Sequence, residues 1–138
     1  MKTLSQIVRQ ALTPDQIALW ESAKSLRTVE APQGSLELLW ADGIFQIERV
    51  SVHPNTPIPK HRHPNVASWE YLLKGNGLVC IKHRVISVEN DIDTRLQFVP
   101  RNVWHVGHTN DLGAYWLSIQ KWFSAPTSVA EDWDGNKI

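Results

Sequence analysis

Two histidines separated by a single residue are the first candidates for chemistry in this chain. His61 and His63 lie in the stretch KHRHPNVASWEYLLKGNG, where a short apolar run follows them and carries one acidic residue, Glu70. Residues two positions apart on a β-strand point to the same face, so a strand here would project both imidazoles together. Imidazole is a common protein ligand for zinc, iron, copper and nickel. The pair is therefore a candidate metal site, although two polar residues on an exposed strand face would show the same spacing.

A third histidine follows in a later stretch, FVPRNVWHVGHTN, in which an apolar run ends at a proline and an asparagine favours a turn. Together the two stretches resemble the paired motifs of the cupin family, which have the forms G-x5-H-x-H-x3,4-E-x6-G and G-x5-P-x-G-x2-H-x3-N. The resemblance covers about residues 44–122. The matching positions are His61, His63, Gly75, Pro100 and His105.

The chain departs from these motifs at several positions. Asn55 and Asn102 stand where the family has glycine, and asparagine is, after glycine, the residue that best tolerates a positive φ. Ser68 stands at the position of the family's glutamate, and Glu70 lies two residues further along the same strand face. Two alternatives follow. Either Glu70 binds the metal after a small register adjustment in the turn before it, or the site consists of three histidines with Glu70 beside it.

The resemblance implies an all-β fold, a double-stranded β-helix or jelly-roll barrel, with one divalent transition metal held by His61, His63 and His105. Iron, manganese, nickel and zinc all suit such ligands. The implied function is that of a metal-dependent enzyme, dioxygenase-like or Lewis-acid in its chemistry, acting on a small chelating molecule, with Glu70 as fourth ligand or general base. A non-catalytic small-molecule or sugar-binding domain, or a metal-free isomerase or epimerase of the sugar-nucleotide kind, are the alternatives. The resemblance also implies a homodimer.

Composition excludes several other classes of function. The chain has 138 residues, is 42% hydrophobic, and carries 14 basic and 14 acidic residues. With no net charge, it lacks the electrostatic signature of a protein that binds nucleic acid or an anionic membrane. No apolar run approaches the ~20 residues of a membrane span, and the N-terminus lacks the apolar core of a signal peptide. The single cysteine, Cys80, cannot form an internal disulfide, so we expect a cytoplasmic protein.

Periodicity indicates where the elements lie. Residues 3–12 carry an amphipathic helical stripe, and Thr13-Pro14 predicts the start of a second helix that runs to about Leu26. We therefore expect a helical segment over residues 1–30 packed on the barrel, a barrel over 31–123, and a polar surface tail over 124–138. Strands are predicted at residues 36–40, 44–52, 77–81, 84–88, 96–99, 103–106 and 114–122, together with the histidine stretch itself.

Other polar residues near the candidate site have less specific patterns. His53, His83 and His108 lie off the ligand spacing and are expected to be exposed, although His108 would suit the mouth of the site. Alternation turns Trp69 and Trp104 away from the metal face. The last strand has two faces, one with Tyr115, Leu117 and Ile119 and the other with Trp116, Ser118 and Gln120, and the sequence does not say which one lines the pocket.

Overall fold

Two short helices precede eight β-strands in the computed structural model, which describes residues 2–89, 91 and 93–124. The predicted tail, apart from Ser124, lies outside the described residues. Strands dominate the described chain, which confirms the all-β fold with a short α-helical N-terminal segment. The elements are α1 (Leu4–Ala11), α2 (Pro14–Ser22), β1 (Arg27–Ala31), β2 (Gly34–Asp42), β3 (Phe45–Val52), β4 (Pro57–His61), β5 (Val66–Ile81), β6 (Arg84–Val88), β7 (Leu96–Val99) and β8 (His105–Trp122).

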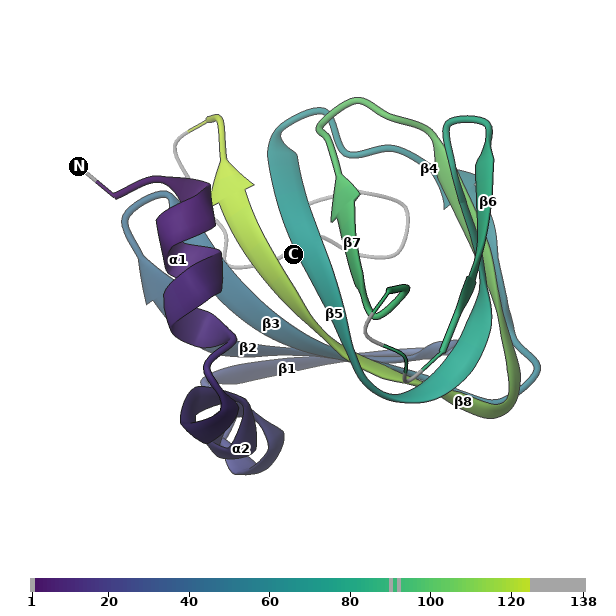
Figure 1. Cartoon of the computed structure of the whole chain (residues 1–138), viewed down its shortest axis with the longest axis horizontal. Helices are drawn as coiled ribbons and strands as arrows, with labels where there is room; N and C mark the ends of the chain where they lie inside the picture. Colours follow the sequence, from purple (N-terminus) through teal and green to yellow (C-terminus); the bar gives the residue numbers. More distant parts are fainter. Residues whose placement is uncertain (1, 90, 92, 125–138) are drawn as a thin grey trace.

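All eight strands belong to one antiparallel sheet, in the order β1-β2-β3-β8-β5-β6, with β4 paired to β8 and β7 paired to β5. The two long strands, β5 and β8, have 16 and 18 residues and curve together, so that the sheet folds over itself into the walls of a barrel (Figure 1). Among the described residues the strand order does not close into a ring. No described helix is long and apolar enough to cross a membrane.

Strands β5 and β8 are longer than the sequence predicts, because each continues through a stretch where separate short strands are expected. Gly75-Asn76-Gly77 has the composition of a turn, yet β5 continues through it and stays paired with β8, with register shifts between Leu72 and Lys74 and between Gly75 and Gly77. Gly75 has φ +108°, and a Cβ atom there would lie 2.1 Å from the carbonyl oxygen of Gly113. Glycine thus lets the two backbones approach and bend together without breaking the ladder.

The N-terminal segment is less helical than predicted. Thr13 caps α2 and Pro14 takes its first position, as the sequence indicates, but the helix ends at Ser22 rather than near Leu26. Ala23 is already extended, and the Leu26 backbone N–H donates to the Leu38 carbonyl at 2.7 Å. The chain leaves the helix because backbone pairing with β2 begins there, and β1 therefore starts within the segment assigned to helix.

The two helices cover the outer face of the sheet (Figure 1). Ile7, Val8 and Ala11 of α1 pack in one cluster with Leu117 and Ile119 of β8, both of which are fully buried. The opposite face of the same strand, with its alternate side chains, therefore faces the barrel interior. This packing decides between the two faces of the last strand that the sequence leaves open.

Candidate metal centre

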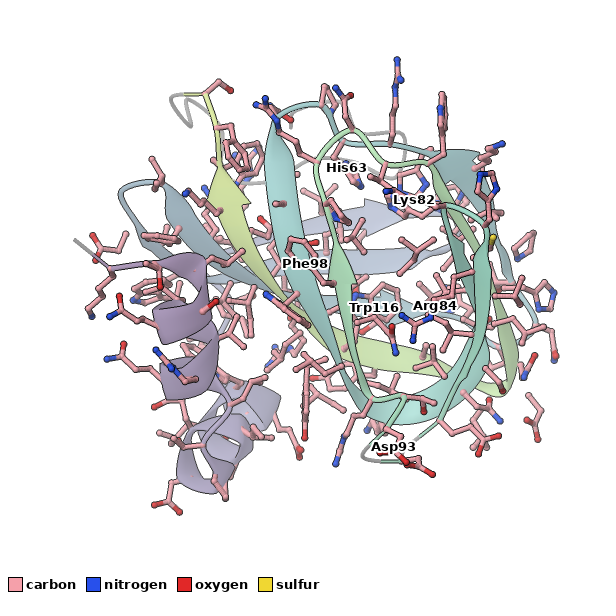
Figure 2. The ribbon with its side chains drawn as sticks, turned by 45° about the horizontal axis from the view of Figure 1, so that its top comes forward. His63, Lys82, Arg84, Asp93, Phe98 and Trp116 are labelled. Carbon is pink, nitrogen blue, oxygen red and sulfur yellow. The ribbon has the colours of Figure 1, made fainter. Side chains whose placement is uncertain are left out.

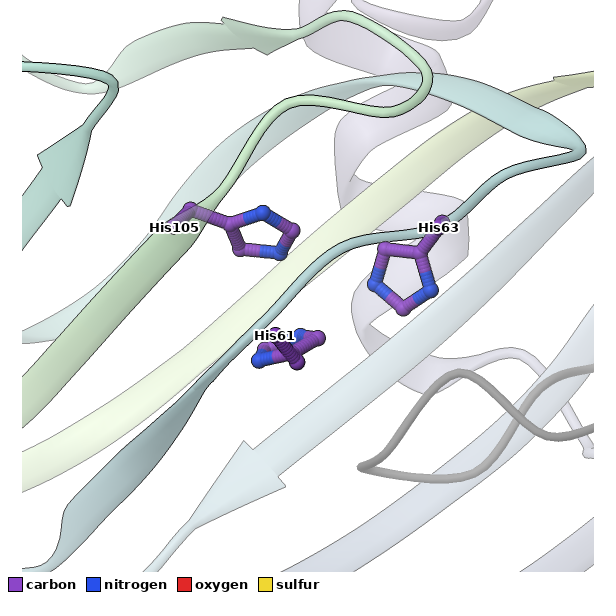
Figure 3. A group of neighbouring side chains, drawn as sticks. All are labelled: His61, His63 and His105. Atoms are coloured by element: carbon purple, nitrogen blue, oxygen red, sulfur yellow. The ribbon is translucent and has the colours of Figure 1, made fainter.

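Three histidines converge at one end of the barrel (Figure 3). His61 ends β4, His105 begins β8 directly opposite it in the strand register, and His63 follows in the next turn. One nitrogen of each ring lies within 4.8 Å of the other two. Two residues from one strand end and one from a distant strand thus meet only because β4 pairs with β8.

Backbone carbonyls fix the orientation of two of the rings. Nδ1 of His61 lies 2.7 Å from the carbonyl oxygen of Pro59, and Nδ1 of His105 lies 2.9 Å from that of Val103. A carbonyl only accepts, so Nδ1 carries the proton in both rings and Nε2 carries the lone pair. A metal-binding histidine usually donates such a hydrogen bond from its other ring nitrogen, and this bond holds the ring and selects the tautomer.

Asparagines with positive φ build the loops around the triad. Asn55 has φ 51° and Asn102 has φ 64°, so both replace glycine in the left-handed conformation, as predicted. The Asn102 backbone N–H also donates to the His63 carbonyl oxygen at 2.7 Å. The turn after β7 is thereby tied to the turn that carries His63, which holds the third histidine beside the other two.

The arrangement fits a transition metal. Two imidazole nitrogens bound to one ion at ~2.1 Å each lie at most ~4.2 Å apart, so small side-chain rotations would close the observed spacing. Three neutral imidazoles suit zinc, iron, nickel or manganese. Three protein ligands would leave further coordination positions open to a bound molecule.

Burial keeps one of the three rings neutral. The pKa of His105 is lowered from 6.5 to about 4, first by burial and then by the neighbouring charge of His61, while its hydrogen bond to Val103 acts in the opposite direction. At neutral pH this histidine therefore has its lone pair available without first losing a proton.

This shift predicts an acid-sensitive fold for the metal-free protein. Between pH 6.5 and 4 the unfolded chain binds a proton at His105 that the folded chain does not, so the free energy of unfolding falls as the pH drops through this window. From pH 7 to 4.5 we expect about 2 kcal/mol of this loss to come from His105. Urea unfolding of metal-free protein measures it, and His105→Gln should lose correspondingly less over the same interval. An equal loss in both proteins would contradict the assignment.

A cavity of about 210 Å³ extends from the triad into the barrel. Its wall is mostly apolar, as in most small-molecule sites. Trp116 projects into the interior from β8, with His63 at one end of the barrel (Figure 2). The apolar lining includes Leu36, Val50, Ile58, Val66, Leu72, Val79, Ile81, Val99 and Trp122.

Glu70 lies in this cavity but is not part of the three-histidine group. Its Oε1 accepts hydrogen bonds from Ser68 Oγ at 2.7 Å and Ser118 Oγ at 3.0 Å. Burial raises the pKa of the Glu70 carboxyl, and the two hydroxyls, the charge of His63 and a hydrogen bond with the Trp116 side chain partly counter this. Ser68, which occupies the family's glutamate position, thus orients Glu70. Direct metal binding by Glu70 stays a prediction, as does its role as a base.

The remaining sequence candidates lie outside the triad. His53, His83 and His108 are exposed, and His108 also borders the cavity. Trp69 packs against the helix-side core and Trp104 is 46% exposed, so both turn away from the histidines as alternation predicts.

Glu48 is a cavity residue that the sequence reasoning missed. It lies on β3, faces the interior and is only 3% exposed. The signal was present in the period-two pattern of β3, because Gln46 and Glu48 alternate with the apolar Phe45 and Ile47 in a strand buried on both faces. A polar residue at an interior-facing position of a buried strand is unusual, and it therefore indicates a functional site.

Cupin domains are among the solved structures that are similar to this one. The cupin-2 domain protein Rru_A2000 from Rhodospirillum rubrum has 18% identity and a TM-score of 0.59, covering 69% of this chain and 68% of that chain. The chain has the cupin fold. KdgF from Halomonas sp. is similar at 9% identity and a TM-score of 0.61, covering 73% of this chain and 87% of that chain.

A mutant of Bacillus subtilis oxalate decarboxylase OxdC also shares the cupin fold, at 20% identity and a TM-score of 0.59, with 74% of this chain but only 29% of that chain covered. Neither a family model nor a curated protein matches the sequence. These similarities confirm the resemblance at the level of the fold. The chemistry of this cupin domain has to be argued from its own residues.

The hydrogen bonds of Glu70 favour the second of the two alternatives for the metal site, in which Glu70 stands beside three histidines. We expect Glu70→Gln to lower metal affinity by less than about tenfold. Such a loss lies at or below the low end of the ~10–100-fold losses seen for residues that support a ligand, whereas removal of a direct ligand would cost more. Ser68→Glu should tighten metal binding, since it restores a carboxylate at the family position one strand step nearer the histidines. Competition against a chelator measures both. A much larger loss in Glu70→Gln would show that the carboxylate binds the metal.

Proposed function

We propose that this protein is a metal-binding cupin that holds one divalent transition metal at His61, His63 and His105 and acts on a small molecule in the adjoining cavity. The observation that carries the proposal is the convergence of three ring nitrogens within 4.8 Å, two of them with Nδ1 fixed by a backbone carbonyl. When bound, the metal would supply Lewis-acid chemistry or dioxygen activation at its open positions. An oxidoreductase activity follows from the second of these alternatives.

The side chains that line the cavity would exclude water from the ligand and exchange a proton with it. The apolar wall excludes water from the ligand and strengthens the polar interactions inside the cavity. Glu70, oriented by two hydroxyls and with its carboxyl pKa raised by burial, can exchange a proton with a bound molecule. Glu70 lines the same cavity as the three histidines, which supports this role.

The second candidate function is non-catalytic binding of a small molecule or sugar in the same cavity. The polar groups deep inside the barrel favour it, because a hydrogen-bonding interior can recognise a ligand without a metal. The two functions share the cavity and differ in whether the metal is required.

Metal analysis tests the proposal directly. The protein should be prepared without a histidine tag and measured by mass spectrometry for iron, manganese, nickel and zinc against protein concentration. We expect about one metal ion per chain, since each site uses three ligands from a single chain. A preparation that contains no transition metal, and takes none up from each of the four ions supplied in turn, would overturn the proposal.

A homodimer remains a prediction. Strands β1 and β6 end the sheet order among the described residues, and an unpaired strand edge favours pairing with a second copy. Light scattering should return about twice the 15.7 kDa mass of the chain across a range of concentrations. A mass that stays at the monomer value would count decisively against the dimer.

A further inference from the structure

A block of polar side chains interrupts the apolar lining of the cavity. Ser118 of β8 stands directly between Glu48 of β3 and Glu70 of β5 in the strand register. The adjacent row places Gln120 between Gln46 and Ser68 in the same way. Side chains two positions apart share a face, so these two rows form one patch on the interior side of three neighbouring strands. We call this patch, Gln46, Glu48, Ser68, Glu70, Ser118 and Gln120, the polar floor.

The polar floor uses up its own hydrogen-bond donors. The Ser68 and Ser118 hydroxyls both donate to Oε1 of Glu70. The amide Nε2 of Gln120 donates to Oε1 of Glu48 and, at 3.1 Å, to Oγ of Ser118. Each hydroxyl has one proton and the amide has two, so no donor of these three side chains remains.

Two acceptors of the polar floor are left without a donor. Oε2 of Glu70 and Oε1 of Gln120 are buried, and neither accepts a hydrogen bond of normal geometry, although the Trp116 side chain also interacts with the Glu70 carboxyl. Gln120 is only 7% exposed and its side chain borders the cavity. A buried acceptor without a donor costs roughly 1–3 kcal/mol, so it marks a place where a ligand or water donates.

Basic groups near the triad disfavour an organic cation as the ligand of the cavity. Lys60 Nζ and Arg62 Cζ lie 5.6 and 4.8 Å from the ring centroid of Trp104, the residue before His105. Within the described part of the chain neither side chain forms an ion pair. Arg95 adds a guanidinium to the cavity wall, where it donates to the Leu72 carbonyl oxygen at 2.8 Å. Set against the two carboxyl groups of the polar floor, these positive charges favour a neutral donor over a cation there.

We propose that the polar floor recognises the hydroxyl groups of a small polyhydroxylated molecule, which donates to Oε2 of Glu70 and Oε1 of Gln120. The inference deepens the proposed function, since it assigns the ligand class of the same cavity. Binding at the polar floor uses residues apart from the three histidines. It is therefore measurable in metal-free protein, and its failure is separate from a failure to bind metal.

Three six-membered rings of similar size provide matched probes. They are myo-inositol with six hydroxyls, cyclohexanol with one, and cyclohexylammonium with a single positive charge. Calorimetric titration of metal-free and metal-loaded full-length protein should give saturable binding of myo-inositol at millimolar concentrations or below. Cyclohexanol and cyclohexylammonium should each bind about tenfold more weakly, because each offers fewer neutral donors.

Two substitutions in the polar floor test the acceptors themselves. Gln120→Met keeps the length of the side chain but removes the amide, and Glu70→Gln replaces one carboxylate oxygen with a donor. Each should weaken myo-inositol binding by about tenfold. Gln33→Met is the matched control, since it makes the same substitution in the turn between β1 and β2 and should leave binding unchanged.

Several results would overturn the inference. The first is a lack of saturable myo-inositol binding. Equal affinity for cyclohexanol would indicate an apolar site, and tighter binding of cyclohexylammonium would indicate a cation site. Unchanged affinity in both folded variants would also overturn it, because the hydroxyls would then bind elsewhere. Circular dichroism and urea unfolding of each variant confirm that it is folded before its affinity is compared.

Discussion

The double variant His61→Ala/His105→Ala should retain less than about a tenth of the metal that the unmodified protein holds, because one remaining imidazole cannot form a stable site. The two residues are opposite each other in the β4–β8 register and supply two of the three converging nitrogens. Mass spectrometry after dialysis against a weak chelator measures the metal that remains.

The control for this variant is His53→Ala/His83→Ala, which removes two exposed histidines that lie outside the triad. We expect it to keep its full metal content. Undiminished metal in the His61/His105 variant, or an equal loss in the control, would show that the metal is bound elsewhere. Since His105 is buried and neutral, the variant should fold, and its unfolding curve in urea checks this.

Leu117→Ala should lower the free energy of unfolding by about 2–5 kcal/mol. Leu117 is completely buried, and it packs in the cluster that joins β8 to Ile7, Val8 and Ala11 of α1. Truncation there removes apolar contacts and leaves a cavity between helix and sheet. Urea unfolding followed by tryptophan fluorescence gives the change in the denaturation midpoint.

The matched control is Val85→Ala, a truncation on β6 at a side chain that is 69% exposed. It should change the free energy of unfolding by less than about 0.5 kcal/mol. Metal content per folded chain should stay the same in Leu117→Ala, because its side chain faces the helices rather than the cavity. A loss below about 1 kcal/mol would show that the helix-side core does not hold the sheet in place.

The sequence by itself determined the features that depend on local chemistry. The i, i+2 spacing of His61 and His63 and the later His105 predicted the triad that the structure brings together. Asn55 and Asn102 were predicted to adopt positive φ, and both do so. Asp42-Gly43 has the residue types of a tight turn, and it joins β2 to β3 with Gly43 at φ 57°. Each of these depends on residue type and on a backbone conformation only a few residues long.

Only the tertiary structure decided how β5 and β8 run and which of their faces line the cavity. The composition around Gly75 indicated a turn, but pairing with β8 supplies hydrogen bonds that keep the backbone extended through the bend. Packing of α1 against Leu117 and Ile119 turned Ser118 and Gln120 inward, and so brought them beside Glu48 and Glu70. The polar floor joins residues from three strands that are distant in sequence, and their meeting depends on strand register, which local propensity does not encode.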